Sequence, residues 1–96
     1  MNLVIIPRAE EDIRDAAFWY NTEQTGLGQD FLVAVSEKLR LLAQHPQQYP
    51  TRYGTLRTVR LNRFPYLIYY RLKDQHIRVV AVLHEKRDPN TARKRR

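Results

Sequence analysis

The stretch that decides the fold is residues 65–84, PYLIYYRLKDQHIRVVAVLH, which holds two strand-like runs around a short polar connection. Residues 65–72 are rich in aromatic and branched side chains, a composition that favours a β-strand. Residues 76–84 are nearly continuous in apolar side chains, which predicts a central strand covered on both faces. Residues 73–75 have the length of a hairpin connection. The stretch therefore predicts an antiparallel pair of strands inside a sheet.

The segments before this pair predict the rest of the domain. Residues 2–6 are a short apolar run that ends at Pro7, and residues 56–61 form another strand-like run. Apolar side chains recur at helical spacing over residues 8–24 and 28–45, which predicts two amphipathic helices joined as a hairpin. The order β-α-α-β-β-β predicts an α+β fold, with a small, mostly antiparallel sheet and the helical hairpin packed on one face.

Length and composition limit the class of protein. The 96 residues are enough for a single domain over residues 1–96, in which residues 46–55 are expected to be a loop and residues 89–96 a flexible basic tail. The chain has no cysteine, which excludes disulfides and thiolate zinc sites. The histidines have no metal-ligand spacing, so neither a metal nor a cofactor is expected. With no apolar run long enough to span a bilayer, the sequence predicts a cytoplasmic protein without membrane contact.

Charge is distributed unevenly along the chain. Residues 1–50 hold four basic and seven acidic side chains, whereas residues 51–96 hold thirteen basic and three acidic ones. Thirteen of the seventeen basic residues are arginine, whose planar guanidinium binds phosphate and carboxylate through paired hydrogen bonds. The second half therefore indicates a surface for an anionic partner, such as nucleic acid or an acidic protein segment.

Strand alternation gives a set of candidate functional residues. In residues 65–72, Ile68, Tyr70 and Leu72 are expected on one face and Leu67, Tyr69 and Arg71 on the other. In residues 76–84 the expected faces are Ile77, Val79, Ala81 and Leu83 on one side, and Arg78, Val80, Val82 and His84 on the other. The face without helices could thus combine Arg60, Arg71 and His84. Such a cluster, with Arg87 or Glu85 nearby, has the groups that metal-free RNA cleavage needs for phosphate binding and proton transfer.

The same residues also have structural interpretations. A histidine at a strand end, such as His84, is commonly a hydrogen-bonded structural residue. Arg60 and Arg71 could pair with acidic residues of the first helix or of a partner. Tyr69 and Tyr70 are typical of sheet packing, with base stacking as the alternative.

In addition, the chain resembles the RelE/ParE superfamily of bacterial toxins along almost its whole length. The motifs that carry the resemblance are the opening strand before Pro7, Leu27-Gly28 with Phe31, then Leu39, Leu42 and Pro46, then Arg60, Phe64-Pro65-Tyr66-x-Ile68-x-Tyr70-Arg71 and Val82-x-His84-x-x-Arg87-Asp88-Pro89. The Phe-Pro-Tyr strand and the His-x-x-Arg-Asp-Pro ending are more similar to ParE-like members. The lysines that RelE-like members place ahead of the third strand are absent here.

The resemblance implies a toxin of a type II toxin–antitoxin module of the plasmid stabilisation type, neutralised by a cognate antitoxin. ParE-like members inhibit DNA gyrase, RelE-like members cleave mRNA on the ribosome, and an inactive member would only bind antitoxin and act as a co-repressor. An RNase would use His84, Arg60, Arg71 and Arg87 as catalytic residues. The residues predicted to bind the target are Arg57, Arg60, Arg63, Arg71 and Arg87. Those predicted to bind the antitoxin are Leu67, Tyr69, Val80 and Val82, and Leu67, Val80 and Val82 are expected to form a partly open apolar patch.

Overall fold

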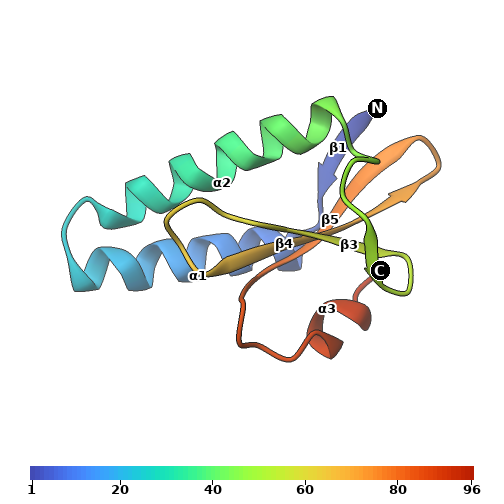
Figure 1. Cartoon of the computed structure of the whole chain (residues 1–96). Helices are drawn as coiled ribbons and strands as arrows, with labels where there is room; N and C mark the ends of the chain where they lie inside the picture. Colours follow the sequence, from blue (N-terminus) through green and yellow to red (C-terminus); the bar gives the residue numbers. More distant parts are fainter.

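The computed structural model describes residues 1–96 and consists of one five-stranded sheet with helices on both of its faces (Figure 1). The elements in chain order are β1 (Asn2–Ile5), α1 (Pro7–Glu23), α2 (Leu27–Gln44), β2 (Thr51–Tyr53), β3 (Leu56–Arg60), β4 (Tyr66–Lys73), β5 (His76–His84) and α3 (Asn90–Arg93). The two long helices begin and end within a residue of the expected boundaries. The predicted α+β class is confirmed.

The sheet has the order β1-β5-β4-β3-β2. β1 is parallel to β5, and the remaining neighbours are antiparallel. Eight consecutive residues of β5, 77–84, are buried or half-buried, as the apolar run predicts. The sequence indicated only a loop over residues 46–55, but the structure places β2 there. This short strand forms because Thr51 and Tyr53 pair with Arg57 and Leu56 across a tight turn.

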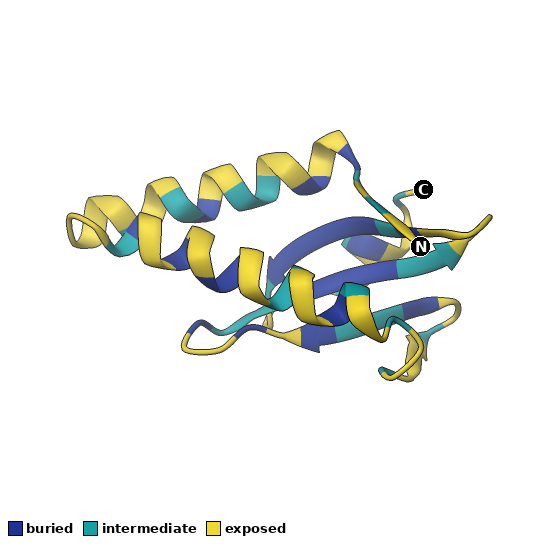
Figure 2. Ribbon diagram, turned by 90° about the horizontal axis from the view of Figure 1, so that it is seen from above, coloured by how far each residue is buried: buried dark blue, intermediate teal, exposed yellow.

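The helical hairpin covers one face of the sheet and buries its aromatic side chains there (Figure 2). The ring of Phe31 lies 5.2 Å from that of Phe64 and 5.1 Å from that of Tyr66, and Tyr20 stacks on it at 5.4 Å. At the start of α2, a Cβ on Gly28 would lie 2.4 Å from the carbonyl oxygen of Ala17. Glycine at this position therefore allows the two helices to approach closely.

A β-bulge in β5 changes which side chains share a face. Tyr69 pairs with Ala81 and Tyr70 pairs with Val79, so Val80 is the extra residue. One inserted residue reverses the alternation beyond it. His84 consequently lies opposite Tyr66 on the helix-covered face, and Arg78 lies opposite Arg71 on the other face. The predicted common face of Arg78, Val82 and His84 is therefore wrong.

The C-terminal segment packs against the sheet face opposite the helical hairpin. The expectation of a flexible tail over residues 89–96 is corrected, because this segment contains α3 and the fully buried Ala92. Arg95 forms an ion pair with Asp12 at 2.6 Å and donates to the carbonyl oxygen of Val80 at 3.1 Å, while the amide of Val82 donates to the Asp12 carboxylate. The Asp12–Arg95 pair thus provides hydrogen-bond partners for backbone groups of β5 beyond the residues that pair with β1.

Candidate functional site

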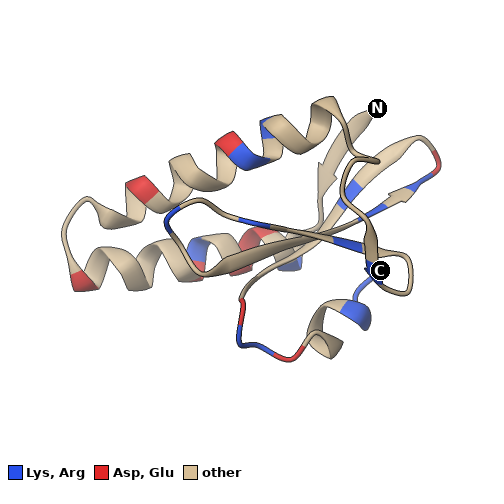
Figure 3. Ribbon diagram, viewed as in Figure 1, with Lys and Arg blue, Asp and Glu red and all other residues tan.

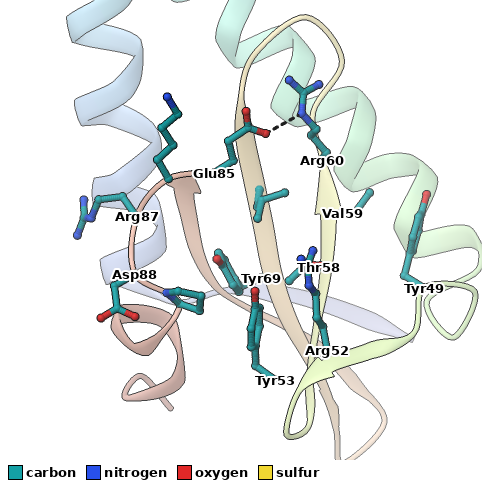
Figure 4. Close-up of a pocket in the computed structure, with 13 residues that line it drawn as sticks. Tyr49, Arg52, Tyr53, Thr58, Val59, Arg60, Tyr69, Glu85, Arg87 and Asp88 are labelled. Carbon is teal, nitrogen blue, oxygen red and sulfur yellow. Dashed lines mark hydrogen bonds and ion pairs between the residues drawn. The ribbon is translucent and has the colours of Figure 1, made fainter.

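A cavity of about 790 Å³ opens on the sheet face opposite the helical hairpin (Figure 4). Strands β2, β3 and β4 form its floor, and the loop after β5 forms one wall. The lining residues that carry a charge or an aromatic ring are Tyr49, Arg52, Tyr53, Arg60, Tyr69, Glu85, Lys86, Arg87 and Asp88. Four cations and two carboxylates give this cavity a positive balance, which favours an anionic partner.

Arg60 and Glu85 form an ion pair at one end of the cavity. Arg60 Nε lies 3.1 Å from a carboxylate oxygen of Glu85, and both side chains are well exposed to solvent. An ion pair of this kind contributes little to stability because water screens it. The Arg60 guanidinium can therefore exchange Glu85 for an anionic group of a partner at small cost.

Tyrosines form the central part of the cavity. The ring centroids of Tyr53 and Tyr69 lie 6.3 Å apart, and the Arg52 guanidinium carbon lies 5.5 Å from the Tyr53 ring. Burial raises the pKa of the Tyr69 hydroxyl, and nearby Tyr53 raises it further, whereas Arg52 opposes the shift. Tyr69 is thus a neutral hydroxyl at physiological pH and cannot serve there as a general base.

The structure separates the predicted target-binding arginines. Arg60 and Arg87 line the cavity, although the Arg87 side chain points away from the tyrosines (Figure 4). Arg57 donates to the backbone carbonyls of Gln47 and Tyr49 and so fixes the loop after α2. Arg63 forms an ion pair with Asp30 at 3.6 Å. Arg71 lies at the other end of β4, where it hydrogen-bonds Thr55 and the C-terminal backbone.

The four predicted catalytic residues do not form one cluster. The His84 ring packs edge-on against Tyr66 on the helix-covered face, with 5.4 Å between the ring centroids. Its Nδ1 accepts a hydrogen bond from the backbone amide of Lys86 at 3.1 Å. Arg60 and Arg71 face the other side of the sheet. His84 and Arg87 do share a smaller cavity of about 280 Å³, but Asp12 and Asp15 line it as well. Two carboxylates there disfavour a phosphate.

Three of the four residues predicted to bind the antitoxin are not open to a partner. Tyr69, Val80 and Val82 are almost completely buried, because the helical hairpin covers one side of the sheet and the C-terminal segment part of the other. Leu67 is half-buried and lines the large cavity.

Comparison with known proteins identifies the family. Residues 3–89 match the family described as the ParE toxin of type II toxin-antitoxin system, parDE. The chain belongs to the ParE toxin family. Among solved structures, a chain of the chromosomal ParDE TA system from P. aeruginosa matches with a TM-score of 0.79 at 20% identity, covering 88% of this chain and 95% of that one. At this identity the match shows a shared fold. Comparison with curated proteins found no match.

Several lining residues of this ParE-family toxin did not emerge from the sequence analysis. Arg52 and Tyr53 belong to β2, which the sequence analysis interpreted as part of a loop. Lys86 lies in the loop after the last predicted strand. The available signal was the pattern Tyr49-x-x-Arg52-Tyr53, in which aromatic and basic residues alternate before β3.

The toxin contains neither a cluster of metal-ligating side chains nor a membrane-spanning helix. No group of three or more histidine, cysteine, aspartate or glutamate side chains is placed to hold a metal ion. None of its helices combines the length and the apolar character needed to cross a bilayer.

Proposed function

We propose that this ParE-family toxin inhibits DNA gyrase by non-covalent binding and that a cognate antitoxin neutralises it. Membership of the ParE family over residues 3–89 is the observation that carries the proposal. The matched ParDE system also pairs a toxin with an antitoxin, which supports a partner of this kind. Since gyrase acts on the bacterial chromosome, the place of action would be the cytoplasm.

The geometry supports inhibition by binding over catalysis. Metal-free RNA cleavage needs a base, an acid and cations around one phosphate. Here His84 lies on one face of the sheet and Arg60 and Arg71 on the other, with the His84 Nδ1 already accepting a hydrogen bond. The open cavity, by contrast, offers Arg52, Arg60 and the partly exposed ring of Tyr53 to a macromolecular surface, without any reactive group being required.

A supercoiling assay with purified gyrase, run beside an in vitro translation assay, tests the proposal. We expect the chain to inhibit supercoiling and to leave translation intact. Arg60→Ala should weaken inhibition because it removes a cavity cation, whereas Arg8→Ala, which removes another well-exposed arginine, from α1, should not. His84→Ala should leave inhibition of gyrase unchanged. Discrete mRNA cuts that disappear in His84→Ala would instead establish the endonuclease.

The antitoxin part of the proposal has a separate test. Co-expression of a small acidic protein encoded beside the toxin gene should restore growth. We place part of its contact at Leu67, the one residue of the expected patch that remains partly exposed. Leu67→Glu should therefore weaken capture of the toxin by the antitoxin, because it puts a carboxylate where an apolar side chain would be buried. Unchanged capture would exclude this contact.

A further inference from the structure

A second cavity of about 430 Å³ lies where the end of β4, the start of β5 and the C-terminal segment meet. Every residue that lines it is basic: Arg71, Lys73, Arg78, Arg93, Lys94, Arg95 and Arg96. We call this set the basic cradle. It contains neither an acidic nor an apolar residue. Figure 3 shows basic positions on α3 and on the strands that lead to the β4–β5 turn, with an acidic position in the turn itself.

The basic cradle places like charges directly opposite each other. Arg71 and Arg78 are cross-strand partners on the same face of the sheet. Like charges in this position destabilise an antiparallel pair. The pKa of Arg71 is lowered, first by burial and then by the positive charge of Arg78. The sheet thus holds two guanidinium groups together at a cost to folding.

The chain supplies little negative charge to offset this cost. Arg71 donates to the backbone carbonyl oxygens of Arg95 at 2.7 Å and Arg93 at 3.4 Å. Arg78 donates at 2.5 Å to an oxygen of Arg96, the last residue of the sequence. Arg95 is the one cradle residue that forms an ion pair with a carboxylate side chain, that of Asp12. Lys73 and Lys94 are exposed and form no ion pair. Asp74 lies beside the cradle, in a neighbouring cavity that Lys73, Arg78 and Arg96 also line. Two carboxylates, those of Asp12 and Asp74, thus adjoin seven cations, and the cradle retains a positive excess that an external anion could satisfy.

We propose that the basic cradle binds backbone phosphates of duplex DNA. An acidic peptide commonly adds apolar anchors to its carboxylates, and the cradle has no apolar side chain to receive them. A DNA backbone offers only closely spaced charge and phosphate oxygens, which is what seven cations without apolar neighbours can bind. The choice of DNA rests on the proposed function, because gyrase holds duplex DNA when it is inhibited.

The position of the basic cradle fits simultaneous contact with enzyme and DNA. Arg71 and Arg60 lie on the same face of the sheet, and Arg71 Nε donates to Thr55 in the turn before β3. The Arg60 cavity and the cradle are therefore two parts of one basic face. The helical hairpin on the other side carries the acidic residues of the first half of the chain (Figure 3). A toxin bound through this face would turn its acidic side away from the DNA.

The test measures binding of a fluorescein-labelled duplex of mixed sequence to the full chain by fluorescence anisotropy, from about 50 to about 200 mM salt. The double variant Lys73→Gln/Lys94→Gln removes two exposed cradle cations that make no structural contact. We expect its affinity to fall roughly tenfold, and the slope of log affinity against log salt to decrease by about two. The matched control Arg8→Gln/Arg40→Gln removes the same charge from the helical hairpin and should change neither quantity.

A second variant addresses the paired guanidinium groups. Arg78→Gln removes one member of the like-charge pair, so it should relieve repulsion and leave thermal stability intact while weakening duplex binding. Equal losses in the cradle variant and the hairpin control would overturn the proposal, because binding would then follow net charge alone. Absence of duplex binding, or tighter binding of a poly-glutamate peptide through the cradle, would overturn it as well.

The supercoiling assay separates this inference from the proposed function. If Lys73→Gln/Lys94→Gln inhibits gyrase as well as the unmodified chain and no duplex binding is measured, the inference fails and gyrase inhibition stands. If the duplex binds through the cradle and gyrase is not inhibited, the inference stands and the proposed function fails. If both hold, the variant should need a higher concentration to inhibit gyrase.

Discussion

The two faces of the sheet are built from different chemistry. The face under the helical hairpin is closed by apolar and aromatic side chains, with Phe31 and Ile68 fully buried. The opposite face is partly covered by α3 and otherwise carries Arg60, Arg71 and the tyrosine cavity. Burial of apolar surface drives folding, whereas exposed cations contribute little to it. The difference assigns stability to the first face, and we propose that the second, which we call the recognition face, binds the partners of the chain.

The C-terminal segment connects the two faces. Arg95 lies in the C-terminal segment on the face opposite the helical hairpin, whereas Asp12 belongs to α1 of the hairpin. The two side chains meet at the edge of β5 with 10% and 12% of their surfaces exposed. The basic chain end is thereby held in a fixed position instead of moving freely. Changes on each face, and at the link between them, can show how far the division holds.

The largest effect is expected from Phe31→Ala. Phe31 has no exposed surface and packs against the rings of Tyr20, Phe64 and Tyr66. Its removal leaves a cavity among these rings, so the free energy of unfolding should fall by about 3–5 kcal/mol. Urea unfolding followed by fluorescence measures the change.

Phe18→Ala is the matched control on the same helical hairpin. Phe18 lies on α1 with 74% of its surface exposed, so the same truncation should change stability by less than about 0.5 kcal/mol. Equal losses in the two variants would contradict the assignment of stability to the packed face.

A smaller effect is expected at the link between the faces, from Asp12→Asn. The change leaves the largely buried Arg95 side chain without its carboxylate partner and weakens the acceptor for the Val82 amide. Removing one partner of a fully buried ion pair lowers the free energy of unfolding by about 3 kcal/mol or more. Because both side chains keep some exposure, we expect about 2 kcal/mol by urea unfolding, with faster proteolysis after residue 89.

Asp15→Asn serves as the control, since Asp15 is exposed on the same helix and forms no ion pair. If Asp12→Asn leaves the C-terminal segment equally resistant to protease, the pair does not hold that segment in place.

Sequence reasoning found the packed face more completely than the recognition face. The periodicity of Ala9, Ile13, Ala16 and Tyr20 encodes the helix stripe directly, because a single element determines it. The β5 run Val79-Val80-Ala81-Val82 has no polar alternation, so nothing in it reveals the bulge that reorients His84. The Asp12–Arg95 pair joins residues 83 positions apart, a separation that no local pattern records.

Alkaline pH should destabilise the fold through its buried tyrosines. Burial raises the pKa of the Tyr20, Tyr66, Tyr69 and Tyr70 hydroxyls. When the folded-state pKa is raised, the contribution to stability is complete below the unfolded value of about 10 and is lost as pH rises through the folded value. The urea midpoint should hold steady up to about pH 9 and fall above about pH 10.

Tyr70→Phe sharpens this test, because Tyr70 donates its hydroxyl to the carbonyl oxygen of Pro46 at 2.7 Å. The variant should lose about 1 kcal/mol at neutral pH and show a shallower decline above pH 10. A decline of unchanged steepness would exclude Tyr70 from the alkaline transition.

The smallest effect on stability is expected on the recognition face, from Glu85→Gln. The Arg60–Glu85 pair is exposed, so its loss should change the free energy of unfolding by less than about 1 kcal/mol. The same change removes a negative charge from the cavity and frees the Arg60 guanidinium for a partner. Under the proposed function, inhibition of gyrase should therefore require less toxin at low salt, and the gain should shrink as salt screens the field. A substitution that leaves folding almost untouched while strengthening inhibition would separate the two faces functionally. A loss of inhibition would instead mean that Glu85 itself contacts the target.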